Sequence, residues 1–383
     1  MKQELNRKIK TLKPIIMGYY IVSCLYINFI YWYSFHFGEL SYLTKEDYKI
    51  WKKAMVSMLK ENCKARGHLR VTQLIKSFAL SKIAVVRKTD NTNPQNPIVI
   101  LCVKNDLNRI KMLVDHYRIL GVERFAFMDN GSDDGTFEWL AEQPDIDLYR
   151  CCEKYQTSVK EGWINRIVSY YGFNRWVIIT DSDELIVYEN MEKNRIGDLI
   201  HYAENNGIRR IKGLTLDTYS EGGVFRKTDN IREEYCWIDG DSYVEKKYRA
   251  GLHEITRFVG GPRYRLMKVE ISLSKYPLIF FAPGTISDNA HYQYPHDIIE
   301  GCPCLVGILH YKFIDKDLSE YEKRSQRGSG YSGGGIYYKR YLDFINESGD
   351  ASFMYDRSIK FTDSCVLRSI SLIRPIDFTH ETT

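Results

Sequence analysis

The stretch RWVIITDSDELIV, residues 175–187, joins an apolar run to an abrupt acidic end. Residues 175–180 are almost wholly apolar, so they predict a buried strand. The acidic end contains Asp181 and Asp183, and side chains at positions i and i+2 of an extended segment point to the same side. Such a pair of carboxylates can hold Mn²⁺ or Mg²⁺ and, through the cation, two phosphates. An Asp-rich turn in solvent is the alternative explanation.

The region before this stretch alternates strand patterns with helix patterns. Apolar runs predict strands at 98–103, 124–128 and 146–150, and helical spacing predicts helices at 107–120, 135–142 and 158–171. Such alternation is typical of an α/β fold, so we expect a Rossmann-like, mostly parallel sheet flanked by helices. Ligands bind at the carboxyl ends of the strands in sheets of this kind.

The rest of the chain divides around this α/β region. Residues 1–90 form an N-terminal helical region, in which 40–82 predict two helices, and a polar linker with two prolines follows at 88–97. The α/β half is expected at 98–204. A second half with short strands at 209–216, 278–282 and 305–310 and a helix at 336–346 is expected over 205–346, followed by a C-terminal tail over 347–383.

Polar residues follow two further strands at the point where each strand ends. Lys104, Asn105 and Asp106 end the first strand, and Asp129 and Asn130 end the second. Because these ends lie at the same edge of a parallel sheet as Asp181, we expect all of them to converge on one cleft. Asp129 and Asn130 are expected to face a ligand, whereas oxygens at 133–136 are expected to cap the next helix.

The composition excludes several classes of protein. The chain has 383 residues with 44% hydrophobic and 27% charged types, which are ordinary values for a globular protein. A net charge of +5 over this length does not indicate a basic surface for nucleic acid, so we expect no nucleic-acid partner. Nine cysteines show no paired CxxC spacing, which favours reduced thiols over a zinc ribbon.

Residues 15–37 contain no Asp, Glu, Lys or Arg and are preceded by a basic segment. Their length would span a bilayer, but Ser23, Asn28 and several tyrosines make a poor span. A membrane anchor, an interfacial helix and a packed helix of the soluble fold all remain open. No signal-peptide cleavage pattern follows the stretch.

Residues 98 to about 345 resemble bacterial family-2-type glycosyltransferases of the GT-A fold. The stretches that carry the resemblance are CVKND (102–106), HYRILGV (116–122), DNGSDDGT (129–136), RWVIITDSDELIV (175–187), GGPRYRL (260–266), SKYPLI (274–279) and GILHYKF (307–313). The resemblance implies a GT-A-like fold and transfer of a sugar from a nucleotide-sugar, expected to be a UDP-sugar, to a hydroxyl of a glycan or glycolipid such as a cell-surface polysaccharide. It assigns the nucleotide-sugar to 98–204, and the acceptor and the completed metal site to 205–346.

The resemblance also implies roles for individual residues. Residues 104–106 and Asp129 would contact the nucleoside, Asp181 the ribose or the metal, and Asp183 and His310 the metal. The chain departs from the group by Lys-Asn-Asp in place of Arg-Asn-Glu at 104–106 and by Asn130 in place of an Asp. These departures put the base contact in doubt.

An inverting transferase also needs a carboxylate or another base that accepts the acceptor's proton, and it needs cations for the leaving diphosphate. Lys312, with Arg263 or Arg265, is the expected cation. Asp217 is the first candidate for the base, Glu221 the second, and His291 could be either the base or a sugar contact. A packed or surface role is the alternative for each of these residues.

Two other functions stay open at this point. A nucleotidyltransferase would also join phosphates, a metal and an α/β sheet, but it would usually carry a Gly-rich basic loop after the first strand, which CVKNDLNR (102–109) lacks. A non-catalytic glycan- or membrane-binding module is the other. The thiol content and the cytosolic supply of nucleotide-sugars favour a cytoplasmic, membrane-associated enzyme over a single-pass protein with a lumenal catalytic domain.

Overall fold

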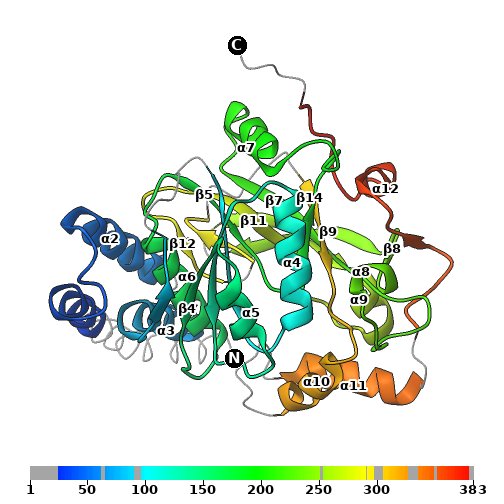
Figure 1. Cartoon of the computed structure of the whole chain (residues 1–383), viewed down its shortest axis with the longest axis horizontal. Helices are drawn as coiled ribbons and strands as arrows, with labels where there is room; N and C mark the ends of the chain where they lie inside the picture. The colour runs from blue at the N-terminus through cyan, green and yellow to red at the C-terminus, as the bar shows by residue number, and fades with distance from the viewer. Residues whose placement is uncertain are drawn as a thin grey trace, which may run out of the picture.

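The computed structural model describes residues 25–61, 65–89, 96–250, 253–289, 291–296, 305–326, 335–348 and 352–378. Within these residues the chain builds a large central sheet with helices on both faces (Figure 1). The α/β class that the sequence predicts is therefore confirmed.

The central sheet has nine strands. Their spatial order is β1 (Ala84–Arg87), β4 (Ile146–Arg150), β3 (Arg124–Asp129), β2 (Ile98–Val103), β5 (Arg175–Ile179), β11 (Ser274–Phe281), β7 (Arg210–Asp217), β14 (Leu305–His310) and β6 (Glu184–Val187).

The sheet has a parallel half and a mixed half. Strands β4, β3, β2 and β5 run parallel to one another. Strand β11 is antiparallel to both β5 and β7, while β14 runs parallel to β7 and antiparallel to β6 at the edge. Edge strand β1 is antiparallel to β4. The sheet is mostly parallel in strand direction, as expected, and all seven strands predicted from the sequence are present.

Strand β6 is the element of the decisive stretch that sequence reasoning missed. After β5 the acidic segment turns, and residues 184–187 form the far edge of the sheet instead of continuing as a loop. All four residues of β6 are buried. The acidic segment is therefore held between two buried strands, one near the centre of the sheet and one at its edge.

The helices cover both faces of the sheet. They are α2 (Lys45–Glu61), α3 (Ala65–Leu80), α4 (Leu107–Ile119), α5 (Thr136–Glu142), α6 (Thr157–Ser169), α7 (Ile196–Asn205), α8 (Ile231–Glu234), α9 (Gly261–Met267), α10 (Asp317–Ser325), α11 (Ile336–Ser348) and α12 (Ser364–Ser369).

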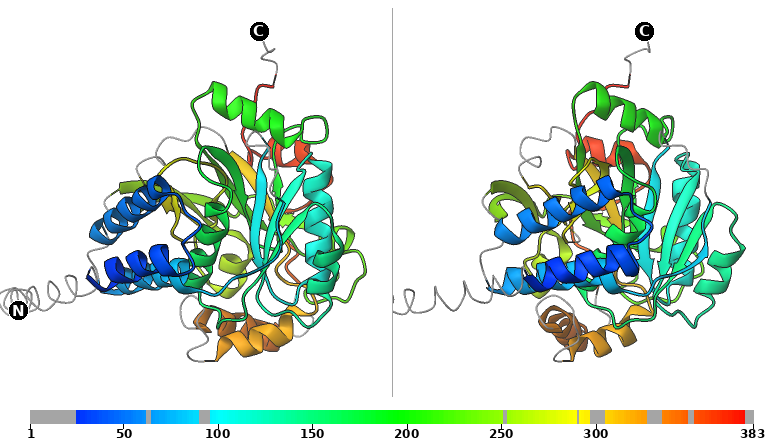
Figure 2. Two further views of the ribbon diagram at one scale, coloured as in Figure 1. Left: turned by 60° about the vertical axis from the view of Figure 1, so that its left-hand side comes forward. Right: turned by 90° about the vertical axis from the view of Figure 1, so that its left-hand side faces the viewer.

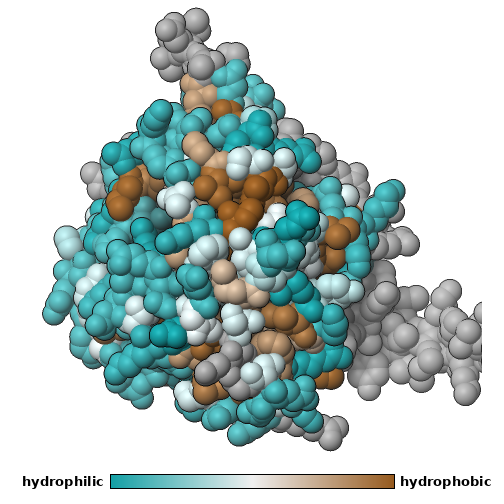
Figure 3. Space-filling view, turned by 90° about the vertical axis from the view of Figure 1, so that its right-hand side faces the viewer, coloured by the Kyte–Doolittle hydropathy of each residue, from teal (hydrophilic) through white to brown (hydrophobic). Residues whose placement is uncertain are grey.

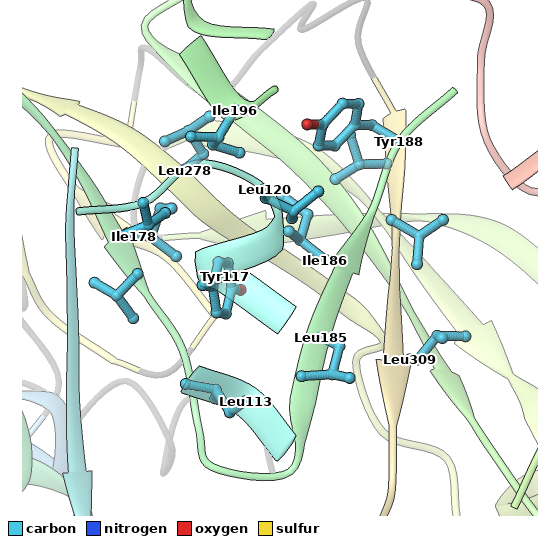
Figure 4. Close-up of a cluster of buried hydrophobic side chains, with 14 of the residues drawn as sticks. Leu113, Tyr117, Leu120, Ile178, Leu185, Ile186, Tyr188, Ile196, Leu278 and Leu309 are labelled. Atoms are coloured by element: carbon cyan, nitrogen blue, oxygen red, sulfur yellow. The ribbon is translucent and has the colours of Figure 1, made fainter. Parts of the chain in front are cut away.

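Alternate residues of β2 enter two different cores, because successive side chains of a strand point to opposite faces. Val99 and Leu101 join the core that includes α4 and α7, whereas Ile98 and Ile100 join the core that includes α2, α3 and α6. This double burial explains the unbroken apolar run of the strand. In the first core, labelled side chains of α4 lie against those of β5, β6 and β11 (Figure 4).

The two helices predicted over 40–82 are present as α2 and α3. Helix α3 packs along α6, and both lie on one face of the sheet (Figures 1 and 2). Residues 25–37 form a further helix beside them. Residues 15–24 of the apolar segment lie outside the described residues. No helix among the described residues is long and apolar enough to cross a membrane.

Smaller sheets complete the second half of the chain. They are formed by β9 (Tyr243–Ala250) with β10 (His253–Gly260), by β12 (Ile286–Ser287) with β13 (Gln293–Tyr294), and by β8 (Trp237–Asp239) with β15 (Ser358–Lys360). The C-terminal region is packed on the body of the molecule, since Leu367 and Ile373 belong to the same core as α4. The backbone N–H of Arg374 also donates to the carbonyl oxygen of Leu305 at 3.0 Å, so this region helps to hold β14 in place.

Candidate active site

A cavity of about 350 Å³ lies at the carboxyl ends of β2 and β5. It is bounded by the strand ends, by the start of α6 and by α10 and α11. Its lining is rich in both acidic and basic side chains. The residues that line it are Cys102, Val103, Lys104, Asp106, Arg109, Asn130, Tyr155, Thr157, Lys160, Asp181, Ser182, Asp183, Glu184, Thr215, Arg263, Ile271, Ser272, Lys275, His291, His310, Lys312, Asp317, Tyr321, Arg324 and Tyr338.

The strand register in the mixed half of the sheet places one histidine between two carboxylates. His310 at the end of β14 is paired with Glu184 on β6 and with Asp217 on β7. Residues paired across neighbouring strands have adjacent side chains. The late histidine and the acidic segment, far apart in the sequence, therefore meet because β14 lies between β6 and β7.

His310 is held by carboxylates at both ring nitrogens. Its Nδ1 lies 2.6 Å from Asp217 Oδ1, and its Nε2 lies 3.2 Å from Asp183 Oδ2. Burial alone would lower the pKa of His310, but Asp183 and Asp217 raise it overall. In this arrangement one carboxylate fixes the ring, and the other nitrogen points toward the acidic segment.

Asp217 lies behind His310 rather than in the cavity. The side chain is 1% exposed, and its second oxygen accepts a hydrogen bond from Arg263 Nε at 2.6 Å. Burial would raise the pKa of Asp217, but Arg263 and His310 lower it overall. A carboxylate so held is suited to orienting a histidine and poorly suited to accepting a proton from a substrate.

Asp183, Glu184 and His310 offer ligand atoms that all lie within 4.8 Å of one another. Thr215, on β7, lines the same cavity, and its buried hydroxyl has no hydrogen-bond partner among the described residues. The carboxylate donors and the unsatisfied oxygen fit Mn²⁺ or Mg²⁺, and the imidazole favours the transition metal Mn²⁺ of the two. This set shares Asp183 and His310 with the predicted Asp181, Asp183 and His310 and adds Glu184, while a metal contact of Asp181 stays a prediction.

Asp181 is instead neutralised by two lysines. It forms ion pairs with Lys160 of α6 and with Lys275 of β11, whose Nζ lies 2.9 Å from Asp181 Oδ2. Lys275 Nζ also lies 2.5 Å from Glu184 Oε1. Burial raises the pKa of Asp181, but Lys160 and Lys275 outweigh it, so the net pKa is well below its ordinary value. The acidic segment is therefore flanked by two buried cations.

The end of β2 contributes two of its three predicted residues to the cavity. Lys104 and Asp106 line it, and Asp106 is buried among Lys316, Arg109 at 3.6 Å and the hydroxyl of Ser182. Asn105 does not line it.

Asn105 has a positive φ of 53°. Its amide Nδ2 donates to Asp133 Oδ1 at 2.7 Å, and its Oδ1 accepts from Asp133 N at 2.8 Å. It therefore ties two loops together.

The end of β3 behaves in a similar way. Asp129 is fully buried, and its carboxylate accepts hydrogen bonds from the backbone N–H groups of Gly131 and Ser132 at 3.0–3.2 Å. Arg150 lies 3.2 Å from the same carboxylate. Asp129 does not line the cavity, whereas Asn130 does. Asp129 thus has a loop-building role in the structure, while Asn130 lies at the cavity, and the ligand contacts of both residues stay predictions.

The two remaining candidate bases lie in different surroundings. Glu221 is exposed and is not among the residues that line the cavity. His291 lines the cavity, and its Nδ1 lies 2.9 Å from the backbone oxygen of Ser274. Burial and the neighbouring Lys275 lower the pKa of His291 to about 4, so its ring is neutral near pH 7. Of the three predicted catalytic residues, His291 alone faces the cavity.

Sequence reasoning missed the cations that face the acidic segment. Lys160 is 7% exposed and stands in α6 between Val159 and Glu161, whereas Lys275 precedes the apolar run of β11. A lysine beside an apolar run signals a buried partner, so the sequence offered this signal for Lys275 and not for Lys160. Arg109 is a third such case, buried and paired with Asp317 of α10 at 3.0 Å.

Lys312 occupies the position expected for a cation beside the cavity. Its Nζ lies 5.7 Å from the ring centroids of both Tyr321 and Tyr338. Burial lowers the pKa of Lys312, but Tyr338, Tyr341 and Asp183 raise it overall. The wall formed by α10 and α11 is therefore both aromatic and cationic.

Comparisons with known proteins give distant structural likenesses only. No family model matches the chain, and no curated protein matches it. A mannosyltransferase from Pyrobaculum calidifontis, solved in complex with GDP-Man and Mn²⁺, is 12% identical with a TM-score of 0.23, over 44% of this chain and 47% of that one. The chain thus spans about half the length of that enzyme.

Two further solved structures cover more of the chain. Residues 1–349 of TarS from S. aureus are 10% identical with a TM-score of 0.29, over 66% of this chain and 74% of that one. A UDP-glucose pyrophosphorylase from Acinetobacter is 10% identical with a TM-score of 0.27, over 64% and 98%. At these scores no residue role passes from any of the three to this chain.

Proposed function

We propose that the protein is a metal-dependent glycosyltransferase that moves a sugar from a nucleoside-diphosphate sugar, a UDP-sugar, to a hydroxyl of a glycan or glycolipid. The observation that carries the proposal is one cavity in which Asp183, Glu184 and His310 gather beside buried lysines. A cation site next to fixed positive charge is what a diphosphate leaving group requires.

Different residues of the cavity would bind different parts of the donor. Asp183, Glu184 and His310 would hold the divalent cation, which would neutralise charge on the leaving diphosphate. Asp217 keeps His310 oriented through the 2.6 Å contact to Nδ1. Lys312, two residues beyond the end of β14, supplies a cation at the cavity, and the rings of Tyr321 and Tyr338 offer apolar faces beside it.

His291 is the group in the cavity best placed to accept the acceptor's proton. Its Nδ1 is engaged with the Ser274 carbonyl, so the tautomer with hydrogen on Nδ1 leaves Nε2 as the acceptor. Its pKa of about 4 leaves this nitrogen unprotonated near pH 7, and the same low value makes it a weak base, so position is the argument for His291. Asp217 and Glu221 are weaker candidates, since one is bound to Arg263 and His310 and the other lies outside the cavity lining.

The proposal is tested by ligand-dependent stability. The melting temperature of the full chain is measured with Mn²⁺ alone, with UDP alone and with both. The pair should raise the stability by about 2.7 kcal/mol when free ligand reaches about 100 times its Kd. Asp183→Asn should remove this gain, whereas Asp343→Asn, at an exposed position of α11, should keep it.

Product analysis separates the proposed reaction from the alternatives. Incubation with a panel of nucleotide-sugars and Mn²⁺ should release the nucleoside diphosphate from one of them. Release of nucleoside triphosphate from a nucleotide-sugar and pyrophosphate would show a nucleotidyltransferase instead. Absence of any gain in stability with UDP, GDP or other nucleoside diphosphates would reject the proposed function, and a full gain in Asp183→Asn would reject the metal assignment.

A further inference from the structure

The helix of residues 25–37 has apolar side chains on two sides, and only one side is packed. Its inner side enters the core through Ile27, Ile30 and Tyr31. Its outer side exposes Leu25 by 66%, Phe29 by 59%, Trp32 by 44%, Tyr33 by 47% and Phe37 by 69%. No Asp, Glu, Lys or Arg occurs in this helix.

The exposed side chains form one continuous row, which we call the outer stripe (Leu25, Phe29, Trp32, Tyr33 and Phe37). Leu25, Phe29, Tyr33 and Phe37 are spaced by four residues, so they lie on one face of the helix. Ring centroids are 6.3 Å apart for Phe29 and Tyr33, 5.9 Å for Tyr33 and Phe37, and 5.8 Å for Trp32 and Phe37. A contiguous exposed apolar row of this kind marks an interaction surface.

The outer stripe lies at the periphery of the molecule. In the right-hand view of Figure 2 the helix of residues 25–37, in dark blue, and α2 face the viewer, outside the layer that contains the sheet. The opposite face of the molecule, seen in Figure 3, is mostly hydrophilic with separate hydrophobic areas.

Two lysines lie against aromatic rings that belong to the helix of residues 25–37 or stack on it. Lys76 Nζ lies 4.8 Å from the ring centroid of Tyr26, which is 46% exposed. Lys52 Nζ lies 5.7 Å from the ring of Tyr48, and that ring stacks on Phe35 at 4.2 Å.

The preceding chain has the same sign of charge. Residues 2–13 contain five basic residues and one acidic residue, and residues 14–24 contain no charged residue. On α2, exposed Lys45, Lys49 and Lys53 outnumber Glu46 and Asp47. The sequence that precedes the helix and the exposed side of α2 therefore both carry net positive charge.

We propose that the outer stripe docks on the surface of an anionic lipid bilayer, with the helix lying in the plane of the interface. Aromatic side chains are enriched at membrane–water interfaces, and apolar faces flanked by lysines bind anionic lipid through burial and charge together. The excess of basic groups favours an anionic partner over a second copy of the chain, because a second copy would bring the same charges together. The inference does not depend on the proposed function.

The test is co-sedimentation of the full chain with vesicles of phosphatidylcholine containing about a third phosphatidylglycerol, and with vesicles of phosphatidylcholine alone. The wild type should bind the anionic vesicles, and the bound fraction should fall as salt rises. The triple variant Leu25→Gln/Phe29→Gln/Phe37→Gln should bind at least tenfold more weakly. A control variant, Ile119→Gln/Val244→Gln, changes exposed apolar residues elsewhere and should bind as the wild type does.

Because all of the altered side chains are exposed, the variants should melt at the temperature of the wild type in buffer without lipid, and this measurement accompanies the binding assay. The proposal is overturned if the triple variant binds the vesicles as the wild type does, or if the wild type does not bind them. It is also overturned if the wild type is a dimer without lipid and the triple variant is a monomer, since a second copy would then occupy the stripe.

Discussion

The carboxyl ends of β2 and β3 and the turn between β5 and β6 have similar polar sequences, but the structure uses them differently. At β2 and β3, Asn105 and Asp129 direct their side chains to neighbouring loop groups. At the turn, Asp181, Asp183 and Glu184 face the cavity and are met by charged side chains from other strands. Backbone N–H groups donate to the carboxylate of Asp129, which makes it a loop-building residue, whereas the carboxylate of Asp183 lines the cavity and meets the ring of His310.

The largest expected effects come from neutralising one carboxylate in each region. Asp129→Asn should lower the free energy of unfolding by about 2 kcal/mol, because it weakens charge-assisted bonds from Gly131, Ser132 and Arg150. It should leave the stabilisation by UDP and Mn²⁺ in place. Denaturant unfolding with and without these ligands measures both effects.

Asp183→Asn should show the reverse pattern, with loss of the ligand-dependent gain. If Asp129→Asn instead left the unfolding free energy unchanged and removed the gain, Asp129 would contact the ligand directly, as the sequence predicts.

A smaller effect is expected from the residue behind the histidine. Asp217→Asn should weaken Mn²⁺ binding by about 10- to 100-fold, because Asp217 orients His310 without touching the cavity. Excess Mn²⁺ should restore the catalytic rate. If the rate stayed low at saturating Mn²⁺ while the affinity for Mn²⁺ was unchanged, Asp217 would act as the base.

The smallest effect concerns a buried histidine that belongs to neither region. His116 of α4 lies 2.8 Å from the backbone oxygen of Ile186, and burial together with Arg232 lowers its pKa from 6.5 to about 3. The unfolded chain therefore binds more protons between pH 6.5 and 3, and stability falls as pH decreases through this window. The slope contributed by His116 approaches about 1.4 kcal/mol per pH unit.

Urea unfolding at pH 7.5 and pH 5.5 measures this contribution. The loss of stability should be smaller in His116→Gln than in the wild type, since glutamine does not titrate. Equal losses in both proteins would show that other groups carry the acid sensitivity.

Local sequence patterns were sufficient to predict the strands in the parallel half of the sheet. Strands β2, β3, β4 and β5 lie within one or two residues of their predicted bounds, because each is a short apolar run ended by polar residues. Strand β6 was missed because its four residues directly follow an acidic turn. The antiparallel insertion of β11 between β5 and β7 was not predicted either, since strand order depends on contacts distant in the sequence.

The sequence also predicted which residues collect at the candidate site, but not how they are paired. The acidic segment and His310 could be singled out because charged residues at the ends of apolar strands are conspicuous. Their grouping could not be predicted: Glu184 joins Asp183 and His310, while Asp181 binds Lys160 and Lys275. Which carboxylate meets which cation depends on strand register and on residues that come from α6 and β11.

The sequence by itself determined where carboxylates, lysines and apolar runs occur, and therefore the α/β class and the edge of the sheet at which polar groups collect. The spacing of apolar residues and the positions of strand ends are local properties of the sequence, because they depend on which neighbouring side chains can be buried together. Only the tertiary structure decided that β14 lies between β6 and β7, which places Asp217 behind His310 and Asp183 in front of it. The role of each carboxylate follows from these neighbours. Depending on the donors within its reach, a carboxylate can orient a histidine, bind a cation or hold a loop in place.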